Sequence, residues 1–119
     1  GSCPRDWIAA TVLVSVISVH ADRAIVDAGA LALSKDSGLG DSGYGVVIDS
    51  SGMALANLSL VSLSQEHGKL MGDGISQLRV GDRLRIIPNH SCLAVACFET
   101  IYGVRKGVVE HEWTPCRGW

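Results

Sequence analysis

A histidine and a cysteine lie two residues apart in the segment Pro88-Asn89-His90-Ser91-Cys92. The segment follows a run of alternating charged and apolar residues, 82–87, which predicts a half-exposed strand stopped by the proline. Imidazole nitrogen and thiolate sulfur are ligands that suit zinc, so His90 and Cys92 are the candidate metal ligands. A His-x-Cys triplet also arises by chance, and the alternative is a buried cysteine beside a hydrogen-bonded histidine.

Two protein ligands are too few for a structural zinc site, which is almost always four-coordinate. Either further side chains complete the shell, with His67, His111 and Cys116 as candidates, or the site is open. In an open site water or substrate completes the shell, which is the arrangement that a catalytic metal needs.

A second polar group, Gln65-Glu66-His67-Gly68, follows a run, 58–64, that predicts a strand. A polar quartet that ends in glycine is most often only a turn. The alternative is that Glu66 or His67 orients the ion or a substrate from beyond the direct ligands.

Other function classes lack support in the sequence. The net charge is -2 with no basic run, which argues against a nucleic-acid partner. The longest apolar stretch, 7–19, is shorter than the roughly 20 residues of a membrane span and has no basic flank like that of a signal peptide. No glycine-rich phosphate loop is found, and Lys35, Lys69 and Lys106 are expected at the surface rather than as Schiff-base lysines.

Cysteine spacing indicates the redox compartment. The four cysteines form no C-x-x-C pair, so we expect reduced thiols in a cytoplasmic protein, with Cys97 buried in the core.

The elements that must position these residues are mostly strands. About seven short strands are expected, over residues 7–19, 22–29, 45–49, 58–64, 82–87, 101–105 and 108–113. Short helical turns are expected within 30–36 and 90–98, with a loop at 37–44. The predicted fold class is all-β: a closed or nearly closed, mostly antiparallel barrel with one or two short helices. We expect residues 1–2 to be an expression scar and 3–119 to form a single domain, cut from a longer protein.

Several segments occur together in an order that resembles one family. They are Val26-Asp27-Ala28-Gly29 with Leu33-Ser34-Lys35-Asp36, then Glu66-His67-Gly68, then residues 80–92 with the Pro-Asn-His-x-Cys block, and finally residues 113–119 ending in Arg-Gly-Trp. The chain resembles the C-terminal domain of the D-serine dehydratase and D-threonine aldolase family, whose members are similar in plan to alanine racemase.

The resemblance implies a composite active site. An N-terminal α/β barrel, absent from these residues, would hold pyridoxal phosphate on a lysine, and the present domain would close the site over a small D-amino-acid substrate. His90 and Cys92 would bind zinc, which polarises the substrate β-hydroxyl for elimination. The full enzyme would be a homodimer, whereas this chain alone would be inactive and would bind no pyridoxal phosphate.

Alternatives to the dehydratase remain. The chain could instead belong to a D-threonine aldolase or an amino-acid racemase, because the residues that choose between these reactions lie largely in the barrel. A standalone, non-catalytic metal-binding β-domain is the main alternative from a different functional class.

Overall fold

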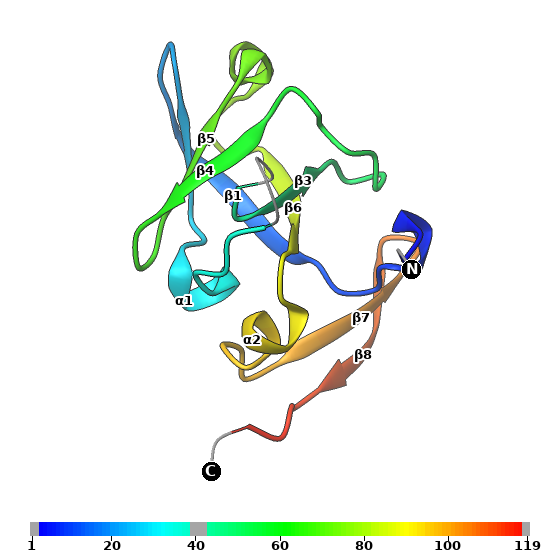
Figure 1. Ribbon diagram of the computed structural model, residues 1–119. Helices are drawn as coiled ribbons and strands as arrows, with labels where there is room; N and C mark the ends of the chain where they lie inside the picture. The colour runs from blue at the N-terminus through cyan, green and yellow to red at the C-terminus, as the bar shows by residue number, and fades with distance from the viewer. Residues whose placement is uncertain (1–2, 39–42, 118–119) are drawn as a thin grey trace.

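The computed structural model describes residues 3–38 and 43–117, and within them strands predominate (Figure 1). The strands are β1 (Val12–Val19), β2 (Ala24–Val26), β3 (Gly45–Ile48), β4 (Ser59–Leu63), β5 (Gly68–Met71), β6 (Arg83–Pro88), β7 (Ile101–Arg105) and β8 (Val108–Trp113). The helical elements are short: η1 (Arg5–Trp7), α1 (Ala30–Leu33), η2 (Asp73–Gln77) and α2 (Ser91–Val95). No helix of the described ranges has the length and apolar character that crossing a membrane requires.

Six strands form one curved antiparallel sheet in the order β3-β6-β1-β2-β5-β4. The two edge strands of the sheet, β3 and β4, approach each other. The amide of Tyr44, just before β3, donates to the carbonyl of Leu60 on β4 at 3.1 Å. The sheet is therefore a nearly closed barrel, as the sequence predicted.

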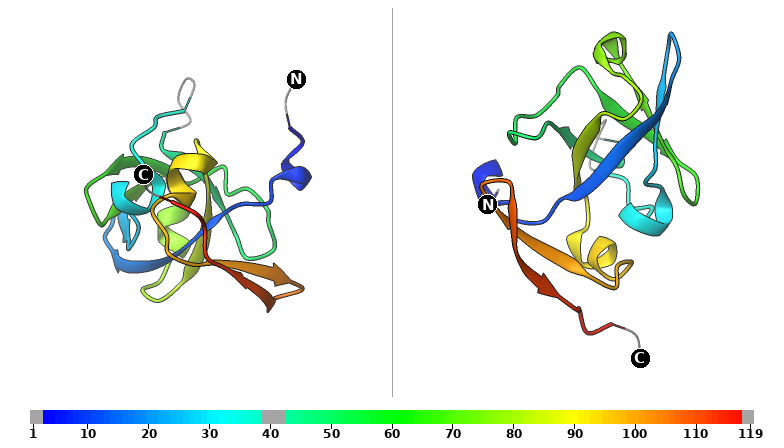
Figure 2. Two further views of the ribbon diagram at one scale, coloured as in Figure 1. Left: turned by 90° about the horizontal axis from the view of Figure 1, so that it is seen from below. Right: turned by 180° about the vertical axis from the view of Figure 1, so that it is seen from behind.

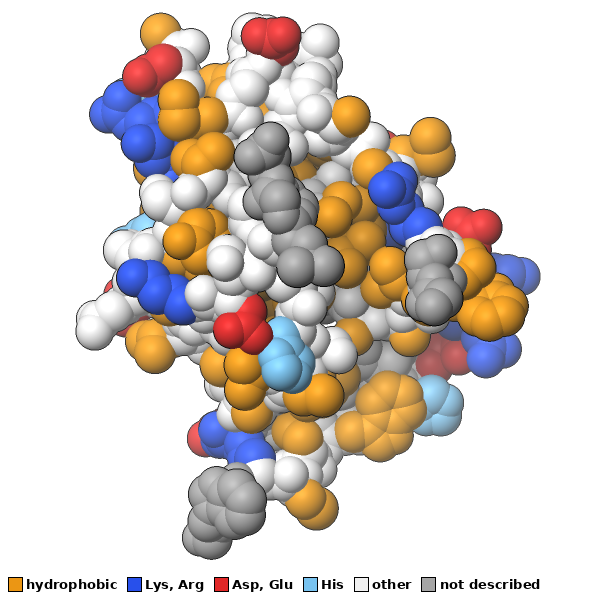
Figure 3. All heavy atoms as spheres, in the orientation of Figure 1, with side chains coloured by type: hydrophobic (Ala, Val, Ile, Leu, Met, Phe, Trp, Pro, Cys, Tyr) orange, Lys and Arg blue, Asp and Glu red, His pale blue; other side chains and the backbone are white. Residues whose placement is uncertain are grey.

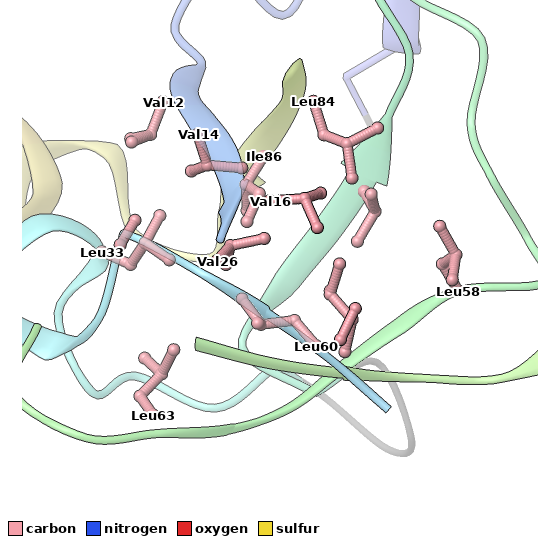
Figure 4. Packing of buried hydrophobic residues seen from close by; sticks show 14 of the residues in the cluster. Val12, Val14, Val16, Val26, Leu33, Leu58, Leu60, Leu63, Leu84 and Ile86 are labelled. Carbon is pink, nitrogen blue, oxygen red and sulfur yellow. The ribbon is translucent and has the colours of Figure 1, made fainter. Parts of the chain in front are cut away.

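The barrel interior holds aliphatic side chains from every strand of the sheet (Figure 4). Alternate residues of β1 point inward, so Val14 and Val16 are buried while Leu13 is 61% exposed. Leu60 of β4, 0% exposed, joins the same cluster. Among the described residues no polar or charged residue is buried, so the core is stabilised by apolar burial.

The last two strands form a hairpin of their own that lies apart from the six-stranded sheet (Figures 1 and 2). Its turn places Lys106 and Gly107 at positive φ, 50° and 77°, which suits a tight two-residue connection. Every residue of β8 is exposed, so little of the hairpin contributes to the core.

The predicted all-β class is confirmed, with two local corrections. The strand expected from Trp7 begins only at Val12, and Trp7 lies in η1 with 77% of its surface exposed. Strand β5 was not predicted, because its four residues directly follow a polar turn and show too little alternation. The expected scar at residues 1–2 lies outside the described residues, as do the last two residues of the terminal Arg-Gly-Trp.

Candidate metal centre

His90 and Cys92 lie at the beginning of α2, directly after β6. His90 precedes the first helical turn with an extended backbone (φ −138°, ψ 96°), and Cys92 is the second residue of the helix. Side chains two apart within one regular helix point to different sides, but here the backbone changes from extended at His90 to helical at Cys92. Both side chains are exposed to solvent.

The imidazole of His90 is held by a carboxylate from a distant part of the chain. Nδ1 of His90 lies 2.8 Å from Oδ2 of Asp36, which is 54 residues away in sequence. Asp36 follows α1, and α1 lies against α2 (Figure 1).

The neighbouring Asn89 ties the same two segments together. Its side-chain amide donates to the carbonyl of Asp36 at 2.8 Å and to that of Gly43 at 2.9 Å. The amide of Gly38 also donates to the Gly43 carbonyl at 2.8 Å. The segment after α1 is thus fixed to the segment before α2 by side-chain and backbone hydrogen bonds.

The other candidate ligands do not complete the shell. His111 lies on β8, where its ring stacks on Trp113 with centroids 5.4 Å apart, and Cys116 is exposed beyond that strand. Over the described ranges, no group of three or more histidine, cysteine, aspartate or glutamate side chains is arranged to hold a metal. Among the described side chains, His90 and Cys92 therefore remain a pair of candidate ligands without a third.

Glu66 and His67 lie in the turn between β4 and β5, near the beginning of α1. The amides of Ala30 and Leu31 donate to the carbonyls of Ser64 and Gln65, at 2.8 and 3.0 Å. The turn therefore anchors the first residues of α1 through its backbone. Among the described side chains, neither Glu66 nor His67 is hydrogen-bonded to His90 or Cys92.

The expectation of a buried Cys97 is wrong. Its side chain is exposed, and Sγ donates to the Leu93 carbonyl at 3.3 Å. The prediction failed because Cys97 lies beyond the end of α2, whose last residue is Val95, whereas the buried position of this segment is Ala94, which is 2% exposed.

An open apolar groove of about 700 Å³ runs between the β7–β8 hairpin and the strands β1 and β6, beside α2. Its walls include Leu13, Phe98, Tyr102 and Val109. In the space-filling view, hydrophobic side chains gather at the surface over the hairpin (Figure 3). This face of the domain carries apolar surface that the domain itself leaves uncovered.

The sequence could not reveal Asp36 and Asn89 as parts of the centre. Asp36 and Asn89 both belong to segments that carry the family resemblance, but nothing in the sequence assigned either of them to His90. Their contacts depend on α1 lying against α2, which no spacing in the sequence indicates.

Several characterised proteins are similar to the chain along its full length. It is 36% identical to the D-threo-3-hydroxyaspartate dehydratase of Delftia sp. (strain HT23), and it covers 35% of that protein. It is 33% identical to the D-serine dehydratase of Dictyostelium discoideum, of which it covers 33%. The chain thus spans about a third of the length of these dehydratases.

Solved structures show the same fold. The Delftia dehydratase matches all of the chain with a TM-score of 0.90 at 35% identity, over 35% of its own length. An alanine-racemase-like protein from Idiomarina loihiensis matches 98% of the chain with a TM-score of 0.89 at 33% identity, over 34% of its length. Structures of two mutants of a D-threo-3-hydroxyaspartate dehydratase match equally well: one replaces a histidine, and the other replaces a cysteine two positions later and is of a metal-free form.

One relative is nearly as short as this chain. An uncharacterised protein of Mycobacterium tuberculosis is 30% identical over 95% of the chain, and the chain covers 86% of it. The family model described as "Putative serine dehydratase domain" matches residues 9–104, which include β1 to β6, both candidate ligands and most of β7. This chain belongs to the serine dehydratase domain family.

Proposed function

We propose that His90 and Cys92 hold a zinc ion and that the chain is the metal-carrying C-terminal β-domain of a D-hydroxyamino-acid dehydratase. The observation that carries the proposal is an exposed imidazole and an exposed thiol at the beginning of α2, separated by the break between extended and helical backbone. Their spacing equals that of the histidine and cysteine replaced in the two mutants of a D-threo-3-hydroxyaspartate dehydratase, and the structure of the cysteine mutant is of a metal-free form.

The donor set suits a catalytic rather than a structural ion. Zinc bound by only two protein ligands keeps positions free for water or substrate, and there it supplies a Lewis acid for the substrate hydroxyl group. His90 and Cys92 would hold the ion at the solvent-exposed beginning of α2, so that its free coordination positions are open to a substrate bound by another domain.

The described residues do not fit pyridoxal phosphate. Lys35 and Lys106 are exposed, and Lys69 lies on β5 opposite Ile25, within the hydrogen-bonded ladder of the sheet. We infer that the longer enzyme carries that cofactor on its N-terminal barrel, where it supplies the electron sink for the reaction. The same barrel would cover the exposed apolar face of the hairpin.

Elemental analysis of purified chains tests the ligand assignment. The wild-type chain is expected to retain zinc, whereas His90→Ala and Cys92→Ala lose it, because one remaining protein ligand holds the ion weakly. Matched controls are His20→Ala and Cys97→Ala, which remove the same side chains at exposed positions outside the centre. Zinc retained in both site variants, or absent from the wild-type chain, would refute the proposal.

The role of the ion is tested in the longer enzyme by treatment with a chelator. Release of the keto-acid product from D-serine is expected to stop, while exchange of the substrate α-proton with solvent continues, because only loss of the hydroxyl group needs a Lewis acid. Equal loss of both, with a matching fall in thermal stability, would instead indicate a structural ion.

A standalone metal-binding domain is the second candidate function, and it is favoured by the short mycobacterial relative. Under that proposal the chain acts without a barrel and catalyses no elimination. The reading frame upstream of Cys3 separates the two candidates, because the dehydratase proposal requires a barrel-coding region there.

A further inference from the structure

The Asp36 carboxylate restricts the state of the His90 ring. A carboxylate can only accept hydrogen bonds, so the nitrogen 2.8 Å from Asp36 Oδ2 must carry the proton. In a neutral imidazole the other nitrogen, Nε2, then carries the free lone pair. The contact therefore selects the tautomer in which Nε2 is the metal-binding atom.

Asp36 is itself held at three points. Its amide donates to Ser34 Oγ at 3.4 Å, its carbonyl accepts from Asn89 at 2.8 Å, and its carboxylate faces His90. Ser34 ends α1 at a positive φ of 62°, which turns the chain out of the helix. The carboxylate thus has a fixed place although its side chain is 47% exposed.

We propose that Asp36 is a positioning residue for the metal centre, which holds the His90 ring with Nε2 directed away from the protein, and that Asn89 holds Asp36. The inference rests on the proposed zinc site. Metal-bound histidines commonly donate their second ring nitrogen to a carboxylate, and removal of such a partner typically lowers metal affinity by about 10- to 100-fold.

The tautomer is measured first, on metal-free protein. Long-range ¹H–¹⁵N correlation spectra of the chain are expected to show His90 protonated at Nδ1. Asp36→Ala should abolish this preference, and Asn89→Ala should weaken it, since the carboxylate then loses its anchor. Asp22→Ala is the matched control: it removes an exposed carboxylate that, within the described part of the chain, is paired only with the adjacent Arg23. An unchanged His90 tautomer in Asp36→Ala would overturn the inference.

Zinc affinity is measured next, by competition with a chromophoric chelator. Asp36→Ala is expected to bind about 10- to 100-fold more weakly than the wild-type chain. Asp36→Asn should bind with intermediate affinity, because an amide oxygen still accepts from Nδ1 but without charge. Asp22→Ala should match the wild type.

The outcomes separate the two proposals. If His90→Ala weakens zinc binding but Asp36→Ala does not, the positioning role is wrong and the zinc site stands. If His90→Ala has no effect on zinc affinity, the zinc site itself is wrong and the inference is refuted with it.

Discussion

Replacement of Gly29 by alanine should detach α1 from the β4–β5 turn. The backbone of Gly29 (φ −118°, ψ −150°) is accessible to alanine, so the restriction is one of space. A Cβ atom there would lie 2.5 Å from the His67 nitrogen and 2.6 Å from the Gln65 oxygen, and backbone atoms cannot move aside as a side-chain end can.

The magnitude follows from the contacts that must shift. Overpacking of a tight site costs about 1–3 kcal/mol. The two hydrogen bonds from Ala30 and Leu31 to the turn contribute about 0.5–1.5 kcal/mol each. We therefore expect a loss of about 2–6 kcal/mol in the free energy of unfolding, and a fall in Tm of roughly 8–24 °C, since about 1 kcal/mol lowers Tm by about 4 °C in a domain of this size.

The assay is urea unfolding followed by circular dichroism. Gly81→Ala is the control, because a Cβ there would meet nothing within 4 Å and only its positive φ of 96° opposes the change. Since α1 leads directly to Asp36, Gly29→Ala should also weaken the Nδ1 protonation preference of His90. A loss below about 1 kcal/mol, or one no larger than that of Gly81→Ala, would refute the reasoning.

Three further predictions concern the core, a turn and the hairpin. Leu70→Ala, at a position that is 0% exposed, should destabilise the chain by about 2–5 kcal/mol in urea unfolding, and a smaller change would show that β5 does not line the core. Hydrogen bonds, chiefly from Ser51 Oγ, lower the pKa of Asp49 from 3.8. The hydrogen bonds therefore stabilise the turn fully above the pKa of Asp49 in the unfolded chain, and this stabilisation is lost as the pH falls through the lower pKa of Asp49 in the folded chain. The NMR shift of the Ser51 amide should titrate with a midpoint below pH 3.8, and a midpoint at or above pH 3.8 would contradict the prediction. The chain should self-associate at high concentration, less so after Tyr102→Ser or Val109→Ser, and light scattering showing a strict monomer would argue against an uncovered apolar face.

The sequence by itself determined the fold class and the candidate ligands. Period-two alternation of apolar residues, as in β1 and β6, follows from the geometry of a strand and can be detected locally. The His-x-Cys spacing after Pro88 is likewise local, since both residues follow the end of one strand. The β7–β8 hairpin could be predicted for the same reason, from Lys106-Gly107 between two apolar runs.

Only the tertiary structure decided which residues surround those ligands. The contact of Asp36 with His90 spans 54 residues and exists because α1 lies against α2. The exposure of Cys97 was likewise decided by packing, since α2 covers the barrel through Ala94 and Cys97 follows the end of the helix at an exposed position. Such contacts arise from the packing of elements that are distant in sequence, and neither local propensity nor spacing carries information about which distant surfaces meet.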